Sequence, residues 1–160
     1  MRRFGLIVLI ALALAGCEGV NNSSVPPNPV HVEIDTRIGA FVNFIPTALN
    51  DYVTVDRTGY HYNGNTYPLG AMDATGYGGV VVYIDMMGNY TAYDMACPYC
   101  AQRARRQSCV IDGIFAICPH CGEEYDLGSG TAVPTKGSIR ETLRRLKIIN
   151  SDGKLTITQQ

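Results

Sequence analysis

The stretch CPHCG, at residues 118–122, is the second of two Cys-x-x-Cys pairs in the chain, and the first is CPYC at residues 97–100. A Cys-x-x-Cys turn, often with proline after the first cysteine and glycine after the second, points two sulfurs at one centre. Two such turns, here 17 residues apart, can surround one ion tetrahedrally. The sequence therefore predicts a metal site formed by Cys97, Cys100, Cys118 and Cys121, although CPYCA lacks the trailing glycine of the pattern.

Other residues near these pairs receive simpler interpretations. Cys109 stands alone between them, and a lone cysteine is more often a small buried hydrophobic residue than a ligand. His120 lies inside the second pair, where the two cysteines are already correctly spaced, so it is expected to be an exposed filler.

Short strand patterns surround the cysteines. Alternation of apolar and polar residues, or a β-branched run such as GGVVVYID, predicts a strand, and Gly-containing turns separate neighbouring strands. The expected strands are 29–35, 52–56, a hairpin around Asn63-Gly64, 78–85, 90–94, two strands within 108–118, 124–127, 131–134 and 153–158. About ten short strands in one chain predict an all-β domain, a sandwich or barrel, over residues 30–160.

One segment has a helical pattern. Ser138 to Lys147 begins with Ser138 and Glu141, which form a capping-box pattern, but its basic residues suit equally an exposed loop leading into a strand at 146–150. Aspartates at strand ends, among them Asp85 and Asp94, are expected to be solvated turn residues.

The N-terminus has the features of an export signal. Arg2 and Arg3 precede an apolar run too short to span a membrane, and residues 14–17 read Leu-Ala-Gly-Cys, which resembles a bacterial lipobox. This resemblance implies a signal peptide at 1–16 and a lipid on Cys17, so that the chain is anchored to a membrane of the bacterial cell envelope. Residues 17–29, rich in Asn, Ser and Pro, are expected to be a flexible tether.

Export bears on the occupant of the metal site. Zinc is expected, because it can bind after export without assembly machinery, whereas a single iron in the same cage would be redox-active and is not excluded by the spacing. Disulfides are a third alternative, since exported chains meet oxidising conditions. A thioredoxin-like role is disfavoured because neither cysteine pair lies in a strand–helix–strand pattern.

Several stretches around the cysteine pairs, YTAYDMACPY, ICPHCGEEYDLGSGTAV and the closing GSIRETLRRLKI with GKLTI, resemble the Rieske family, and the resemblance covers residues 76–158. GYGGVVVY at 76–83 resembles lipoproteins of Bacteroides-like bacteria that carry Rieske-like domains. The resemblance implies stacked antiparallel sheets with two loops that hold a metal centre. Rieske proteins bind a 2Fe–2S cluster through two cysteines and two histidines.

Both histidine positions of that family differ here. Tyr99 occupies the first, with Cys100 one residue later, and Cys121 occupies the second. Cys97 and Cys118 match the cysteine ligands, and a 2Fe–2S cluster would need all four cysteines. Clusters of that kind are normally assembled before export, so zinc is favoured.

The sequence favours a binding or assembly protein over an enzyme. No Ser/His/Asp set, flanked carboxylate pair or phosphate-binding loop is visible in it. An electron carrier with iron is the alternative, and an envelope protein is the expected partner. Nucleic acid is not an expected partner, because the chain without Arg2 and Arg3 has a net charge of 11 − 14 = −3.

Overall fold

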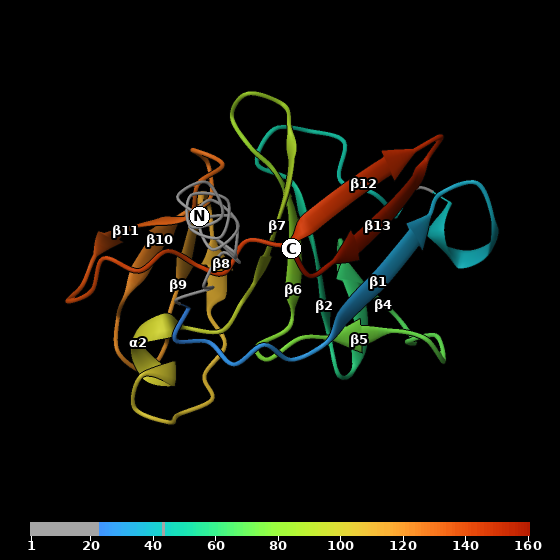
Figure 1. Cartoon of the computed structure of the whole chain (residues 1–160). Helices are drawn as coiled ribbons and strands as arrows, with labels where there is room; N and C mark the ends of the chain where they lie inside the picture. The colour runs from blue at the N-terminus through green and yellow to red at the C-terminus, as the bar shows by residue number, and fades with distance from the viewer. Residues whose placement is uncertain (1–22, 43) are drawn as a thin grey trace, which may run out of the picture.

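The structure is a computed structural model that describes residues 23–42 and 44–160. Strands dominate these residues, and the elements follow one another through short turns (Figure 1). The strands are β1 Val30–Asp35, β2 Tyr52–Asp56, β3 Gly59–Tyr62, β4 Asn65–Tyr67, β5 Ala74–Thr75, β6 Val80–Ile84, β7 Tyr90–Asp94, β8 Val110–Asp112, β9 Phe115–Ile117, β10 Glu124–Asp126, β11 Val133–Lys136, β12 Lys147–Ser151 and β13 Lys154–Thr158. Two short helical turns, η1 Gly39–Phe41 and α2 Pro98–Ala101, interrupt them.

Three antiparallel sheets make up the domain. Their strand orders are β12-β13-β1-β5, β11-β10-β9-β8 and β4-β3-β2-β6-β7. The β8–β11 sheet and α2 lie at one side of the molecule, and β12, β13 and β1 lie at the other (Figure 1). The predicted all-β fold with antiparallel sheets and two cysteine-bearing loops is confirmed.

Turn residues explain most of the hairpins. Asn63 and Gly64 both have positive φ angles, 49° and 76°, and they join β3 to β4 as the Asn-Gly pair predicts. Gly113, with φ 60°, lies in the turn between β8 and β9, whose register pairs Asp112 with Phe115. The predicted strands therefore follow from local chemistry.

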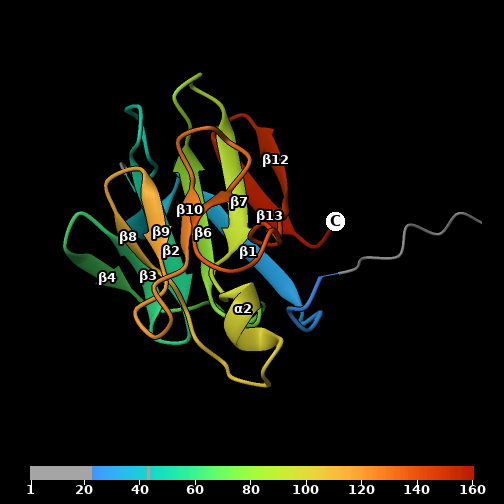
Figure 2. The same cartoon turned by 90° about the vertical axis from the view of Figure 1, so that its left-hand side faces the viewer.

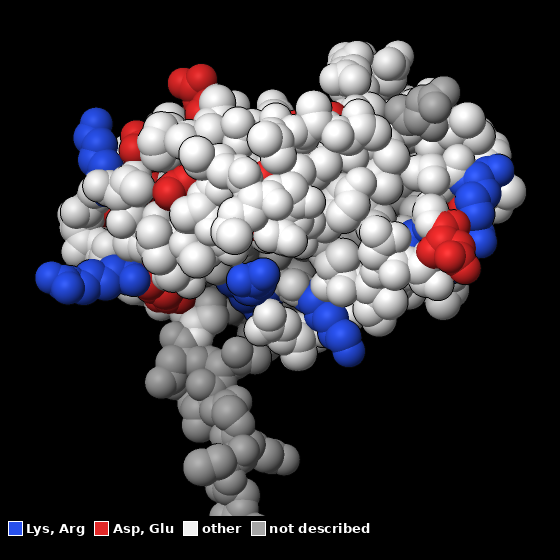
Figure 3. Space-filling model, turned by 90° about the horizontal axis from the view of Figure 1, so that it is seen from above, with Lys and Arg blue, Asp and Glu red and all other residues white. Residues whose placement is uncertain are grey.

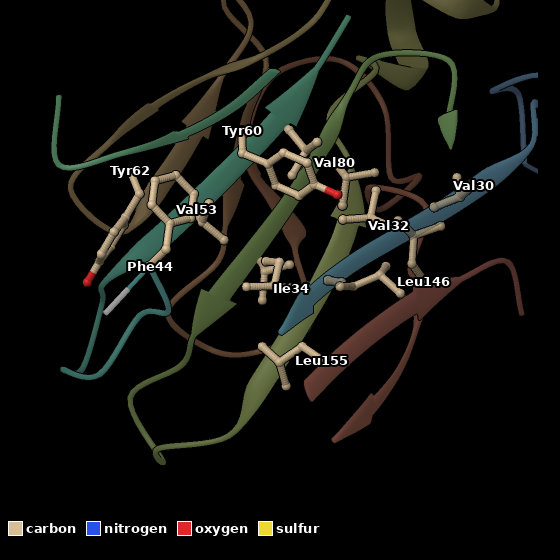
Figure 4. Packing of buried hydrophobic residues seen from close by; sticks show 14 residues of the cluster. Val30, Val32, Ile34, Phe44, Val53, Tyr60, Tyr62, Val80, Leu146 and Leu155 are labelled. Carbon is tan, nitrogen blue, oxygen red and sulfur yellow. The ribbon is translucent and has the colours of Figure 1, made fainter. Parts of the chain in front are cut away.

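Strand β6 separates two hydrophobic cores, which is why its sequence is almost entirely apolar. All five of its residues are buried. Val80 and Val82 pack into a core formed with β1, β2, β3 and β13, shown in close view in Figure 4. Val81 and Tyr83 face the opposite way, as residues of a strand alternate, and join a second core.

The second core contains the cysteines. It includes Tyr93, Tyr125 and Leu127 together with Cys97, Cys100, Cys109 and Cys118. The sulfur atoms therefore lie at the edge of a packed interior and not on a free loop.

The helix predicted over Ser138–Lys147 is wrong, and the alternative of a loop leading into a strand is correct. Residues 137–146 form no helix: they are irregular, with a bend at 137–138 and an isolated bridge between Arg145 and Tyr93, and β12 begins at Lys147. The backbone of this segment bonds to β7: Asp94 N–H donates to Arg144 O at 2.9 Å, and Leu146 N–H donates to Ala92 O at 2.9 Å. These long-range bonds, with Leu143 and Leu146 buried, override the local helical pattern.

The predicted signal peptide, residues 1–16, and Cys17 lie outside the described residues, and the predicted tether is described only from Ser23. From Ser23 the chain contacts the domain: the side chain of Val25 is 2% exposed, and Ser24 N–H donates to Glu141 Oε1. The part of the predicted tether that is described therefore packs against the domain before residue 30. No helix among the described residues is long and apolar enough to cross a bilayer.

Candidate metal centre

The first cysteine loop follows β7 directly. Cys97 N–H donates to Gln107 O at 2.8 Å, and Cys97 is the N-cap of α2, with Pro98 at the first helical position. Because residues three apart lie on one face of a helical turn, α2 presents the sulfurs of Cys97 and Cys100 to the same side. Ala101 is still helical and Gln102 keeps a right-handed helical conformation, so the glycine missing from CPYCA is not required there.

The second loop is a tight reversal between β9 and β10. Cys118 N–H donates to Glu123 O at 2.8 Å, and Gly122 N–H donates to Cys118 O at 2.9 Å. Gly122 has φ 74°, a conformation that glycine adopts without steric cost, so the trailing glycine of CPHCG makes this turn. Figure 2 shows α2 below the ends of β9 and β10, where the two loops meet.

The two loops bring four sulfurs together. The Sγ atoms of Cys97, Cys100, Cys118 and Cys121 all lie within 4.8 Å of one another. Two close contacts cross between the loops: Cys97 to Cys121 is 3.6 Å, and Cys100 to Cys118 is 3.7 Å. All five described cysteines are free thiols. The cysteines are thus positioned to bind a metal, as the spacing of the two pairs predicts.

The crossed contacts predict which disulfides form when the metal-free chain is oxidised. Each short contact needs a contraction of about 1.6 Å to reach a bond length of about 2.05 Å, and each joins different loops. We expect Cys97–Cys121 and Cys100–Cys118 bridges after chelation and oxidation, identified by mass spectrometry of proteolytic fragments. Bridges within each Cys-x-x-Cys pair would contradict the crossed arrangement.

Solvent reaches the four cysteines unequally. Cys97, Cys100 and Cys118 are each 1% exposed, and Cys121 is half-buried. His120, expected to be an exposed filler, is exposed. The open side of the sulfur cluster is therefore at Cys121.

Neighbouring groups shift the thiol pKa values in opposite directions. A hydrogen bond from the Cys109 thiol, with others from Tyr125 and from the Cys100 backbone, lowers the pKa of Cys97 in spite of burial. Burial raises the pKa of Cys100 and of Cys121. Cys97 is thus the most readily ionised of these three, and a bound cation would have to displace protons from the other two.

Cys109 lies beside the cluster and not in it. Its side chain is 5% exposed, in agreement with the prediction of a buried residue. Hydrogen bonding to Cys97, followed by burial, raises the pKa of its thiol, so it stays a neutral donor. The Tyr125 hydroxyl is a second neighbour, 3.6 Å from Cys97 Sγ.

The prediction that the strand-end aspartates are solvated is wrong for Asp85 and Asp94, which are 4% and 0% exposed. Asp94 accepts backbone N–H bonds from Tyr77, Gly78 and Ala96, at 2.7, 2.8 and 2.9 Å. These bonds tie the glycine-rich turn before β6 to the chain that enters Cys97. Asp94 is therefore an anchor of the first cysteine loop.

Glu123 anchors the second loop, and sequence reasoning did not single it out. It is 1% exposed, its Oε1 accepts the Ser138 N–H, and its Oε2 has no partner among the described residues. The carboxyl lies directly against Gly137, where a side chain would collide with it. A glutamate two residues after a Cys-x-x-Cys pair gives no signal of burial, because glutamate is mostly exposed in proteins.

The chain matches no protein-family model and no curated protein. Among solved structures it is similar to a chain described as the complex of reduced oxygenase and oxidized ferredoxin in carbazole 1,9a-dioxygenase. The identity is 14%, the TM-score is 0.46, and the alignment covers 82% of this chain and 94% of the other. It is also similar to the Sphingomonas yanoikuyae B1 ferredoxin, with 17% identity, a TM-score of 0.40, and coverage of 72% and 100%. Similarity at these TM-scores does not indicate what the site binds, so that inference rests on the geometry of the four sulfurs.

Proposed function

We propose that this chain is a lipid-anchored protein of the bacterial envelope in which four thiolates hold one structural zinc ion. The observation that carries the proposal is the convergence of four sulfurs within 4.8 Å of one another. Zinc bound there would crosslink the α2 loop to the β9–β10 loop and so stabilise the fold.

The sulfur separations support one ion. A tetrahedron with metal–sulfur bonds of about 2.3 Å has edges of about 3.8 Å. The two crossed contacts, 3.6 and 3.7 Å, are close to that edge. A two-iron cluster separates the thiolates on opposite irons by the additional metal–metal length, so it fits this cluster less well.

A single iron ion is the second candidate, because the same tetrahedron of thiolates accepts it. The chain would then be an electron carrier for an envelope oxidoreductase. Colour separates the two candidates, since a zinc protein is colourless and an iron–thiolate centre absorbs visible light.

The zinc-bound form has a binding or assembly role in this proposal. Four protein ligands close a tetrahedral site and leave no position for a substrate. Anchoring through Cys17 would place the domain at the membrane, with an envelope protein as its partner.

Two measurements on protein purified from its own envelope test the proposal. We expect one zinc per chain and no visible absorption, and visible absorption with stoichiometric iron would favour the electron carrier. We also expect incorporation of labelled fatty acid that Cys17→Ser abolishes and Cys109→Ser retains. Equal labelling of the two variants would remove the anchor from the proposal.

A further inference from the structure

The positive charges of the domain are concentrated beside the point where the described chain begins. Residues 103–106 and 140–147, which we call the cationic face, contain seven of the 11 Lys and Arg residues that follow residue 17. Their only carboxylate is Glu141. None of the seven cations forms an ion pair with a carboxylate of residues 23–42 or 44–160.

Hydrogen bonds join the two segments of this face to each other and to the N-terminal segment. Glu141 accepts bonds from the backbone N–H of Ser24, from the Ser23 and Ser24 hydroxyls, and from Gln102 Nε2. Arg144 donates to Pro26 O at 3.1 Å. Glu141 is thus occupied by neutral donors, and it forms no ion pair with the neighbouring arginines.

Four arginines of the cationic face reach solvent, and two of them, Arg103 and Arg145, also donate to the carbonyls of Tyr99 and Gly130. Arg103, Arg105, Arg140 and Arg145 are all exposed. The segment before β1, in blue, runs beside α2 in both Figure 1 and Figure 2. Figure 3 shows Lys and Arg side chains, in blue, spaced along the lower edge of the molecule in that view.

Chain length connects this face to the predicted anchor. Five residues lie between Cys17 and Ser23, so the two are six residue steps apart and span at most about 22 Å. A lipid on Cys17 would therefore hold the cationic face within reach of the lipid headgroups. The net charge of the chain after residue 16, 11 − 14 = −3, does not favour contact with anionic headgroups. Attraction to the headgroups would therefore come from the local excess of arginine on the cationic face.

We propose that the cationic face docks the domain onto the anionic phospholipid surface of the membrane that carries the anchor. The proposal rests on the lipid anchor of the proposed function. The arginines bind headgroup phosphates, and this orients the domain with the β8–β11 sheet and α2 near the membrane. One acyl anchor together with a basic patch is a known combination for stable attachment.

The test uses the unacylated chain from Glu18 onward, which contains every described contact, with phosphatidylcholine vesicles that contain or lack phosphatidylglycerol. We expect flotation with the anionic vesicles only, weakened by added salt. Arg105→Gln with Arg140→Gln should reduce binding about 25-fold, because each arginine near the surface contributes about fivefold. The control, Arg57→Gln with Lys154→Gln, removes the same charge outside the face and should change binding less than twofold.

Three outcomes would overturn the docking surface. They are equal binding to neutral vesicles, equal losses in the two double variants, and binding to polyglutamate without binding to anionic vesicles, which would indicate an acidic protein surface instead. Fatty-acid labelling at Cys17 reports on the anchor independently, so failure of the docking surface and failure of the anchor are distinguishable.

Discussion

Replacing Cys118 with alanine is expected to destabilise the domain by at least about 5 kcal/mol, because binding of a structural zinc ion supplies free energy of order 10 kcal/mol that is also folding free energy. Cys118 is 1% exposed and contacts Cys100 at 3.7 Å. Its loss leaves three thiolates and an open coordination position. For a domain of ordinary stability, this change would leave much of the protein unfolded.

Cys109→Ala is the matched control. Cys109 is also buried, at 5% exposure, and neighbours the same cluster, but it does not belong to the group of four. Its replacement should cost about 1–2 kcal/mol, as for other small buried side chains. Urea unfolding of both variants and the unmodified chain, with and without a chelator, makes the comparison.

The chelator distinguishes a metal ligand from a residue that only packs. It should lower the stability of the unmodified chain and of Cys109→Ala while leaving Cys118→Ala unchanged. Unfolding of the two variants at the same urea concentration, or stability of the unmodified chain that no chelator alters, would show that the cysteines do not hold a metal.

Gly78→Ala is expected to have the second largest effect, a loss of about 3 kcal/mol or more, because the added methyl group overpacks a backbone contact. A Cβ at Gly78 would lie 2.1 Å from the Ala96 backbone nitrogen. Ala96 cannot move aside easily, since its N–H and that of Gly78 both donate to Asp94 Oδ1. Displacement of the Ala96 backbone would also move Cys97, the next residue, and should therefore weaken metal binding as well.

Gly113→Ala supplies the comparison for this glycine. Gly113 has φ 60° but nothing within 4 Å of its Cβ position, so alanine there should cost only about 1 kcal/mol of backbone strain. Zinc titration with a competing chromophoric chelator, together with thermal unfolding, measures both effects. Equal melting temperatures for the two variants would mean that the turn before β6 does not support the first cysteine loop.

Local chemistry predicted most of the strands and the convergence of the four cysteines. The hairpin at Asn63-Gly64 and the turn at Gly113 follow from residues that favour positive φ, and the apolar run of β6 follows from burial on both faces. The four cysteines needed only their spacing, because each Cys-x-x-Cys pair brings its two sulfurs together by short-range geometry.

Features that depend on distant partners were not predictable. Residues 138–147 carry a helical pattern, yet backbone hydrogen bonds to β7, about 50 residues earlier in the chain, hold them in an irregular, non-helical path. Asp94 looks like a solvated turn residue until its N–H donors, 16 and 17 residues before it, are known. Glu123 is buried because the segment at Gly137 folds back over it.

X-ray absorption at the metal edge, on protein purified from its own envelope, tests the central claim most directly. A single ion held by Cys97, Cys100, Cys118 and Cys121 predicts one shell of four sulfurs at about 2.3 Å with no metal neighbour. Nitrogen or oxygen in that shell, a second metal close by, or the absence of a stoichiometric metal would contradict it.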